Sequence, residues 1–152
     1  MLLPPRPVVR LVMAAIQQMR RAAWMVTRPK AHGVHAVALT GDGKVVLVRH
    51  TYARGWRLPG GGVHRGEAPA DAMLRELREE IGLRAWTAMR HVLDFEHQPD
   101  FRRGTGLLFR IDGVVFEPAR SLEIDAIAAF DPEMLPPETT AFTREMIDAA
   151  LA

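Results

Sequence analysis

Three glutamates lie on one side of a predicted helix in the stretch AMLRELREEIGL, which runs from Ala72 to Leu83. Successive residues of an α-helix are about 100° apart, so Glu80 lies about 40° to one side of Glu76 and Glu79 lies about 60° to the other. Like charges at this spacing destabilise a helix by about 0.2–0.5 kcal/mol per pair. The acidic face therefore needs a counter-charge, and its chemistry depends on what supplies that charge.

The opposite side of this helix is apolar, because it carries Ala70, Leu74, Leu77 and Ile81. An amphipathic helix buries such a side and leaves its polar side accessible. The simplest interpretation of the acidic side is a solvated surface, since Arg75 and Arg78 lie among the glutamates. Arg75 and Glu79 form an i,i+4 pair, with the cation in the less favourable N-terminal position.

The run GGGVHRGE at residues 60–67 precedes the helix and favours a second interpretation. Glycines leave backbone groups unobstructed and adopt conformations that other residues avoid, so such a loop can approach phosphates or offer carbonyl oxygens to a cation. Mg²⁺ prefers oxygen ligands and is held by a few carboxylates together with substrate phosphates. The loop and the acidic helix together therefore predict a divalent-cation site that also binds a phosphorylated substrate.

The residues from Gly61 to Leu83, GGVHRGEAPADAMLRELREEIGL, resemble the Nudix box, Gx5Ex7REUxEExGU, in which U is aliphatic. Every defined position of the box matches, namely Gly61, Glu67, Arg75, Glu76, Leu77, Glu79, Glu80, Gly82 and Leu83. At residue frequencies of about 6% each, the seven fixed positions agree by chance on the order of 10⁻⁹ per window. The preceding strand pair and the run WRLPGGG are also similar to this family. The resemblance implies an α/β/α sandwich around a mixed sheet.

The same resemblance implies hydrolysis of a pyrophosphate bond in a nucleoside diphosphate linked to another group, X. The reaction in this family depends on a divalent cation, Mg²⁺ or Mn²⁺. By resemblance, its ligands in this chain are Glu76, Glu79 and Glu80, with the backbone carbonyl of Gly60 or Gly61 as an addition.

Catalytic and binding roles also follow from the resemblance. Arg75 would orient a glutamate through an ion pair, and Glu67 would brace the loop or bind metal through water. Family members use either a box glutamate as general base, for which we choose Glu76, or a carboxylate on a later loop, for which Glu123 and Glu96 are the candidates. The predicted catalytic residues are Glu76, Glu79 and Arg75, and the predicted substrate-binding residues are Gly60, Gly62 and Arg57.

The identity of X is less strongly indicated by the sequence. In this family a proline about sixteen residues after the box is typical of ADP-ribose hydrolases, and Pro99 occupies that position relative to Leu83. The run GWRLPGGG instead resembles enzymes that act on nucleoside triphosphates or RNA 5′ ends. We expect an ADP-ribose-like compound or a nucleotide sugar, with a (d)NTP or RNA 5′-end pyrophosphohydrolase as the alternative. A non-catalytic nucleotide-binding module is a second alternative, although such modules usually lose box glutamates and this chain retains all of them.

The composition excludes several other kinds of site. The chain of 152 residues has no cysteine, so disulfides, thiolate zinc sites and cysteine nucleophiles are ruled out. Its only serine, Ser121, is not in a context typical of a nucleophile elbow. The six histidines include no HExxH pair, and we assign none of them to a metal.

Hydrophobic patterning predicts the elements around the box. Residues 8–27 are predicted as a helix, and residues 33–40 and 44–52 as a hairpin turning at GDG. Residues 86–97, 105–117 and 122–130 are predicted as strands, and residues 140–152 as a helix. Pro69 and Gly82 delimit the box helix. Strands between helices, with several hairpins, predict an α/β layered domain. We assign residues 31–152 to this domain and residues 1–30 to a basic helical extension.

Charge is distributed unevenly along the chain. Residues 1–41 carry six basic residues and no acidic one, so the other 14 basic and 18 acidic residues contribute −4 to a net charge of +2. A basic segment can bind nucleic acid or anionic lipid, but a helix docked on its own domain or on a second subunit is the simpler expectation. No apolar run approaches the ~20 residues of a membrane span. We expect a cytoplasmic enzyme that binds a small nucleoside diphosphate derivative rather than nucleic acid, and the N-terminal helix could form a homodimer.

Overall fold

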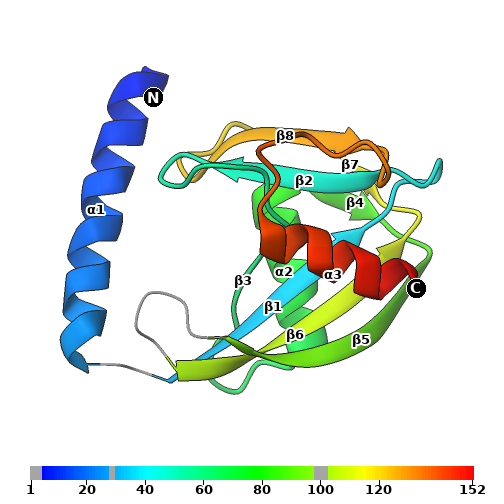
Figure 1. Ribbon diagram of the computed structural model, residues 1–152, viewed down its shortest axis with the longest axis horizontal. Coiled ribbons are helices and arrows are strands. Elements are labelled where there is room, and N and C mark those ends of the chain that lie inside the picture. Colours follow the sequence, from blue (N-terminus) through cyan, green and yellow to red (C-terminus); the bar gives the residue numbers. More distant parts are fainter. Residues whose placement is uncertain (1–4, 28–29, 98–102) are drawn as a thin grey trace.

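A four-stranded mixed sheet forms the centre of the protein (Figure 1). The computed structural model describes residues 5–27, 30–97 and 103–152. Within them the main sheet has the order β3-β1-β6-β5, with bounds Gly60–Gly62, Lys30–Ala38, Arg103–Asp112 and Ala88–His97. β1 and β6 run parallel, while the β1–β3 and β5–β6 pairs are antiparallel. The predicted mixed sheet is confirmed.

Two shorter antiparallel pairs complete the strand arrangement. β2 (Val45–His50) pairs with β8 (Ile124–Phe130), and β4 (Leu83–Ala85) pairs with β7 (Val115–Phe116). Figure 1 shows β2 and β8 above the main sheet. The chain leaves β2 through residues 51–59 and enters β3 directly, which brings the end of β2 into the same region as the glycine strand.

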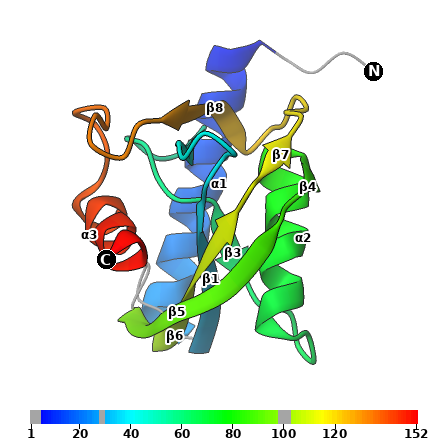
Figure 2. The same ribbon diagram turned by 90° about the vertical axis from the view of Figure 1, so that its right-hand side faces the viewer.

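Helices cover both faces of the main sheet. α2 (Pro69–Ile81) lies on one face and α3 (Ala141–Leu151) lies on the other (Figure 2). α1 (Arg6–Thr27) lies outside these layers, alongside the domain. The predicted α/β/α sandwich with an N-terminal helical extension is confirmed. Each helix in the described part of the chain lacks the combination of length and apolarity that a bilayer-spanning segment requires.

Alternate residues of the central strands fill two separate cores. On β1, Val34 and Ala36 belong to the cluster that contains Leu77 of α2, whereas Val37 belongs to the cluster that contains Ile147 of α3. Side chains alternate across a strand, so a strand buried on both faces forms a nearly continuous apolar run. Burial of the Leu77 side of α2 leaves Glu79 exposed to solvent, whereas Glu80 lies at the border of the buried side and is itself buried.

The ends of α2 are set by two residues that the sequence singles out. Pro69 stands in the first turn, where a missing backbone N–H costs nothing. Gly82 follows the last helical residue in the left-handed conformation, at φ 72°, and its N–H donates to the Leu77 carbonyl. Both predicted boundaries are confirmed.

Of the hairpin predicted at residues 33–52, the turn is confirmed, but the pairing of its two strands with each other is wrong. The turn itself forms, because the Gly43 N–H donates to the Thr40 carbonyl at 2.9 Å. The two strands then separate after a single bridge between Leu39 and Val45. β1 pairs with β3 and β6, and β2 pairs with β8, so each strand forms its ladder with partners distant in sequence.

The glycine run also differs from the prediction, because Gly60–Gly62 form the edge strand β3 rather than a loop. A Cβ atom on Gly60 would stand 2.2 Å from the carbonyl oxygen of Val34. A Cβ atom on Gly61 would stand 2.4 Å from the carboxyl carbon of Glu76. Glycine therefore lets this strand fit between β1 and α2, where a side chain would collide with either neighbour.

Candidate active site

The glutamate face of α2 is turned toward β3 and the end of β2. The side chains of Glu80 and Glu76 are only 7% and 13% exposed, whereas that of Glu79 is 58% exposed. Buried carboxylates are costly unless they are paired and hydrogen-bonded. The partners of these side chains therefore define the site.

Glu80 is held by groups from two neighbouring strands. Its Oε2 accepts a hydrogen bond from the Gly60 N–H at 2.9 Å, and its Oε1 lies 3.4 Å from Nε2 of His50. Gly60 begins β3 and His50 ends β2. Glu80 therefore joins α2 to both strands through a single carboxylate.

Arg75 binds most of the other acceptors on this face. Its guanidinium donates to both carboxylate oxygens of Glu67, at 2.8 and 3.0 Å, and to Glu76 at 2.8 Å. It also donates to the Gly62 carbonyl at 2.8 Å and makes a longer contact of 3.4 Å with Glu79. The planar guanidinium group carries five N–H donors in fixed directions, so one arginine can bind several acceptors at once. Arg75 is thus a shared counter-charge for three of the acidic side chains.

The pKa values of Glu67 and Glu76 shift in opposite directions. The hydrogen bonds from Arg75 lower the pKa of Glu67 to about 2. Burial raises the pKa of Glu76, and the nearby charges of Glu80 and Glu79 raise it further against the opposing effect of Arg75. Burial is therefore the main cause of the raised pKa of Glu76, and Arg75 is the main group that opposes it.

The strand register decides which glycine carbonyl faces the helix. Gly61 lies opposite Val34 of β1, at a position where antiparallel strands exchange hydrogen bonds, so its carbonyl points toward β1. Gly60 and Gly62 point their polar groups the other way, since the Gly60 N–H reaches Glu80 and the Gly62 carbonyl reaches a guanidinium on α2. Of the two carbonyls predicted as metal ligands, the one turned toward α2 is that of Gly60.

The donor set suits a hard divalent cation. Glu76, Glu79, Glu80 and the Gly60 carbonyl supply oxygen atoms only, which is the preference of Mg²⁺ and Mn²⁺. Among the described residues, no three His, Asp or Glu side chains already converge as a complete metal cage. Arg75 holds Glu76 and the Gly60 N–H holds Glu80, so a cation bound there would compete with these partners.

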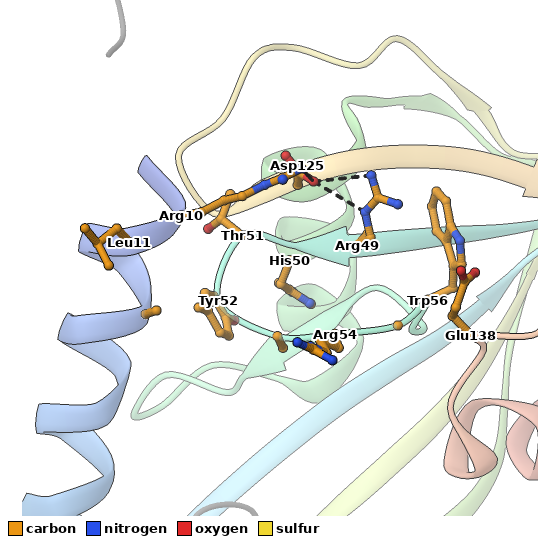
Figure 3. A pocket seen from close by; sticks show the side chains of 13 residues that line it. Arg10, Leu11, Arg49, His50, Thr51, Tyr52, Arg54, Trp56, Asp125 and Glu138 are labelled. Carbon is orange, nitrogen blue, oxygen red and sulfur yellow. Dashed lines mark hydrogen bonds and ion pairs between the residues drawn. The ribbon is translucent and has the colours of Figure 1, made fainter. Parts of the chain in front are cut away.

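An open pocket of about 1140 Å³ lies between α1, the end of β2 and residues 51–56 (Figure 3). Its lining combines cationic and aromatic side chains, including Arg10, Arg49, His50, Tyr52, Arg54 and Trp56. The rings of His50 and Tyr52 are 5.0 Å apart, and the Arg49 guanidinium lies 5.3 Å from the ring centre of Trp56. Because His50 also contacts Glu80, the pocket adjoins the acidic face of α2.

Of the two later carboxylates, Glu123 is the one that the structure brings to this region. Burial raises the pKa of Tyr52 to about 12, and the nearby charges of Glu123 and Glu80 contribute to the rise. The Glu123 carbonyl accepts from the Thr51 N–H at 2.9 Å, which holds its segment beside the pocket. Glu96 lies on β5, three strands from β3, which corresponds to about 14 Å across the sheet.

Arg57 is exposed, and its backbone forms an isolated antiparallel β-bridge with Val48 next to the pocket. Its positive charge partly opposes the rise in the pKa of Tyr52. Its guanidinium makes a long hydrogen bond of 3.4 Å to the Arg54 carbonyl. Pro99, the residue associated with an ADP-ribose-like substrate, lies outside the described residues.

Residues 29–150, most of the chain, match the family model of the NUDIX domain. The chain belongs to the NUDIX family. This match covers the main sheet, the acidic face of α2, and α3 except for its last residue.

Two relatives of this NUDIX chain are named RNA pyrophosphohydrolase. The one from Xylella fastidiosa is 48% identical over 50 residues, which is 33% of this chain and 26% of that protein. The one from Bartonella bacilliformis is 38% identical over 78 residues, which is 45% of this chain and 46% of that protein. The matched segments are thus less than half the length of either relative.

The fold is also similar to solved structures. The crystal structure of a MutT NUDIX hydrolase from Burkholderia pseudomallei aligns with a TM-score of 0.68 at 22% identity. The alignment covers 79% of this chain and 97% of that one. At this level of identity the likeness concerns the NUDIX fold.

Sequence reasoning did not assign His50 and Tyr52, nor the other cationic and aromatic residues that line the pocket. An isolated histidine and a tyrosine ahead of the box carry no motif of their own. The available signal was the run RHTYARGW, in which cationic and aromatic residues accumulate between a buried strand and the glycine strand. Only the tertiary structure shows that this run passes beside Glu80.

Proposed function

We propose that this protein is a hydrolase that cleaves a pyrophosphate bond in a nucleoside diphosphate derivative with the help of a divalent cation. The observation that carries the proposal is the position of Glu76, Glu79 and Glu80 on the side of α2 next to the glycine strand, where the Gly60 N–H binds Glu80 and Arg75 binds the other two. A carboxylate face of this kind, next to an open pocket lined by cations and aromatic rings, suits a phosphorylated nucleotide.

The metal ligands that we propose are Glu76, Glu79, Glu80 and the Gly60 carbonyl. A cation bound there would offset the charge on the phosphate oxygens and increase the acidity of a bound water. Arg75 keeps Glu67 and the Gly62 carbonyl in place around the glutamates, so its role is to position ligands.

Glu76 is the general base that we favour among the candidates. Its carboxylate is only 13% exposed and lies against the backbone of Gly61, so it faces the place where we propose that the cation and its water would bind. Water would attack phosphorus, Glu76 would take its proton, and the bridging P–O bond would break to release the leaving phosphate group. Glu123 is the alternative base, because it approaches the site from the segment beside Tyr52.

The residues that line the pocket favour a nucleotide with more than one phosphate as substrate. Tyr52, His50 and Trp56 offer rings on which a base can stack, and Arg49 and Arg54 offer cations for phosphates. We propose an ADP-ribose-like compound or a nucleotide sugar as substrate. The RNA 5′-end alternative is supported by the names of the two relatives, and a (d)NTP would satisfy the same chemistry.

A substrate panel with Mg²⁺ or Mn²⁺ tests the proposal. It would contain ADP-ribose, nucleotide sugars, dinucleoside polyphosphates, (d)NTPs and triphosphorylated RNA, with isotopically labelled water to locate the phosphorus attacked. We expect cation-dependent cleavage of one class at a pyrophosphate bond. Tight nucleotide binding without any cleavage would instead support the non-catalytic module.

A further inference from the structure

His50 occupies a position of β2 where the pattern of the strand predicts an apolar side chain. Val46 and Val48, four and two residues earlier, are buried in the core cluster that contains Leu77 of α2. Side chains alternate along a strand, so position 50 is directed toward α2 as well. The bulge at this point does not interrupt β2, because its extra residue, Asp125, is on β8. A side chain that is polar and only 11% exposed in such a series indicates a functional position.

The polar group that this side chain meets is the carboxylate of Glu80. Nε2 of His50 lies 3.4 Å from Oε1, and the Gly60 N–H donates to Oε2 at 2.9 Å. An ionised carboxylate only accepts hydrogen bonds, so the contact is attractive when Nε2 carries the proton. Each oxygen of Glu80 therefore has its own donor, one from the end of β2 and one from the start of β3.

The neighbouring glutamates are held in a different way. Arg75, which is on α2 itself, binds Glu76 and Glu79, whereas both donors to Glu80 belong to strands. Two donors on different oxygens fix the rotation of a carboxylate as well as its position. The orientation of Glu80 is therefore set by β2 and β3, against which α2 is packed.

The rest of the imidazole ring is enclosed. The Tyr52 ring packs beside it, with the ring centres 5.0 Å apart and the planes tilted by 35° (Figure 3). Nδ1 is buried, and no hydrogen-bond partner for it lies among the described residues. A buried acceptor without a donor costs free energy. The polar contact that His50 gains in return is the one between Nε2 and Glu80.

We propose that His50 is a positioning residue, which holds Glu80 in the orientation that the divalent cation requires. The inference rests on the proposed function, in which Glu80 is a ligand of that cation. Groups that bind the ligands of a metal, rather than the metal itself, set the direction of those ligands, and their loss weakens metal binding or activity by about 10–100-fold. Because the ring is enclosed on β2, Glu80 keeps its orientation before the cation arrives.

Calorimetric titration of the full chain with Mn²⁺, without nucleotide, tests this inference. His50→Leu removes the donor and should weaken Mn²⁺ binding by about tenfold or more. It should lower kcat for the best substrate of the panel by a similar factor and change KM by less than about twofold. His50→Gln places an amide N–H near the position of Nε2, so it should restore most of both losses. A merely structural histidine would lower stability to urea without changing Mn²⁺ affinity.

His91→Leu is the matched control, because His91 also contacts a carboxylate, that of Asp94 at 2.6 Å, but on β5. It should leave Mn²⁺ binding and kcat unchanged. If His50→Leu does not fold, His50→Asn, whose amide is too short to reach Glu80, takes its place.

The role of His50 is overturned if the variant without the donor binds Mn²⁺ like the unmodified chain, or if His50→Gln loses as much affinity as that variant. Failure of the unmodified chain to bind Mn²⁺ is a different result, since it would overturn the proposed function and this inference with it.

Discussion

Arg75 resolves much of the electrostatic problem that the acidic face of α2 creates. One guanidinium contacts Glu67, Glu76 and Glu79 and also reaches the carbonyl of Gly62. Glu80 is stabilised separately, through the strand backbone and His50. These groups compensate part of the negative charge on this face, while burial raises the pKa of Glu76. We propose that a bound divalent cation supplies further positive charge on this face.

Glu80→Gln should nearly abolish turnover and leave the fold intact. Glutamine keeps an oxygen that can accept from the Gly60 N–H, but it removes the negative charge proposed to bind the cation. We expect kcat to fall by about 10²-fold or more at saturating Mg²⁺, with weaker Mn²⁺ binding in calorimetry. Asp71→Asn, which neutralises an exposed acid on the same helix, should change neither value. Turnover at the unmodified rate in Glu80→Gln would refute the ligand assignment.

Gly61→Ala should impair the site more than the fold. The new Cβ would stand 2.4 Å from the carboxyl carbon of Glu76, so this glutamate must move. We expect activity to fall by about 10²-fold, because displacements of about 1 Å can have this effect. The free energy of unfolding should fall by about 1–3 kcal/mol in urea titration. Gly62→Ala is the control, since its Cβ would meet nothing within 4 Å. Equal effects of the two substitutions would contradict this account.

Tyr52 should ionise only at strongly alkaline pH. Burial and the charges of Glu123 and Glu80 raise its pKa from 10.0 to about 12. A raised pKa contributes stability that is fully present below pH 10 and is lost as the pH rises through about 12. Tyr52 is the only tyrosine, so near-ultraviolet absorbance of the tyrosinate reports it directly, with Tyr52→Phe as a blank. A midpoint near 10 in the folded protein would show that the side chain is not buried beside these acids.

At the scale of elements, sequence reasoning succeeded where local residues set the structure. Pro69 and Gly82 delimit α2 because proline and glycine act on their own backbone. Reasoning failed at the hairpin of β1 and β2, where pairing with distant strands outweighs a local turn. The same limit applies to the site, because the approach of His50 to Glu80 is a tertiary contact that no spacing along the chain encodes.

Gly82→Ala should destabilise the junction between α2 and β4. Gly82 has φ 72°, and an added Cβ would stand 2.0 Å from the Glu117 carbonyl oxygen. We expect the free energy of unfolding to fall by about 2–4 kcal/mol, from left-handed strain plus collision with backbone. Gly43→Ala separates the two causes, because Gly43 has φ 80° and nothing lies within 4 Å of its Cβ position. Gly43→Ala should lower the free energy of unfolding by about 1 kcal/mol in the same urea titration. If Gly82→Ala lowers it by no more than Gly43→Ala does, the proposed collision with the Glu117 carbonyl is refuted.

At the scale of the whole molecule, we propose that residues 31–152 are the catalytic domain and residues 1–30 an extension. Among the described side chains, both hydrophobic core clusters consist of residues beyond position 30, and none from α1 belongs to either cluster. The extension is nevertheless joined to the site, because Asp125 accepts from both Arg10 and Arg49 across the pocket (Figure 3). Fold and substrate binding should therefore depend on α1 to different extents.

Removal of residues 1–29 should leave a folded enzyme that binds its substrate less well. Since the cores are intact, we expect the melting temperature to fall by about 5 °C or less in scanning fluorimetry. The pocket loses the wall formed by Arg10 and Leu11, so KM for the best substrate of the panel should rise about tenfold while kcat changes little. Arg10→Ala in the full chain should reproduce part of the rise in KM without removing the helix. A truncated chain that fails to fold would show that α1 belongs to the domain, and an unchanged KM would show that substrate does not reach this wall.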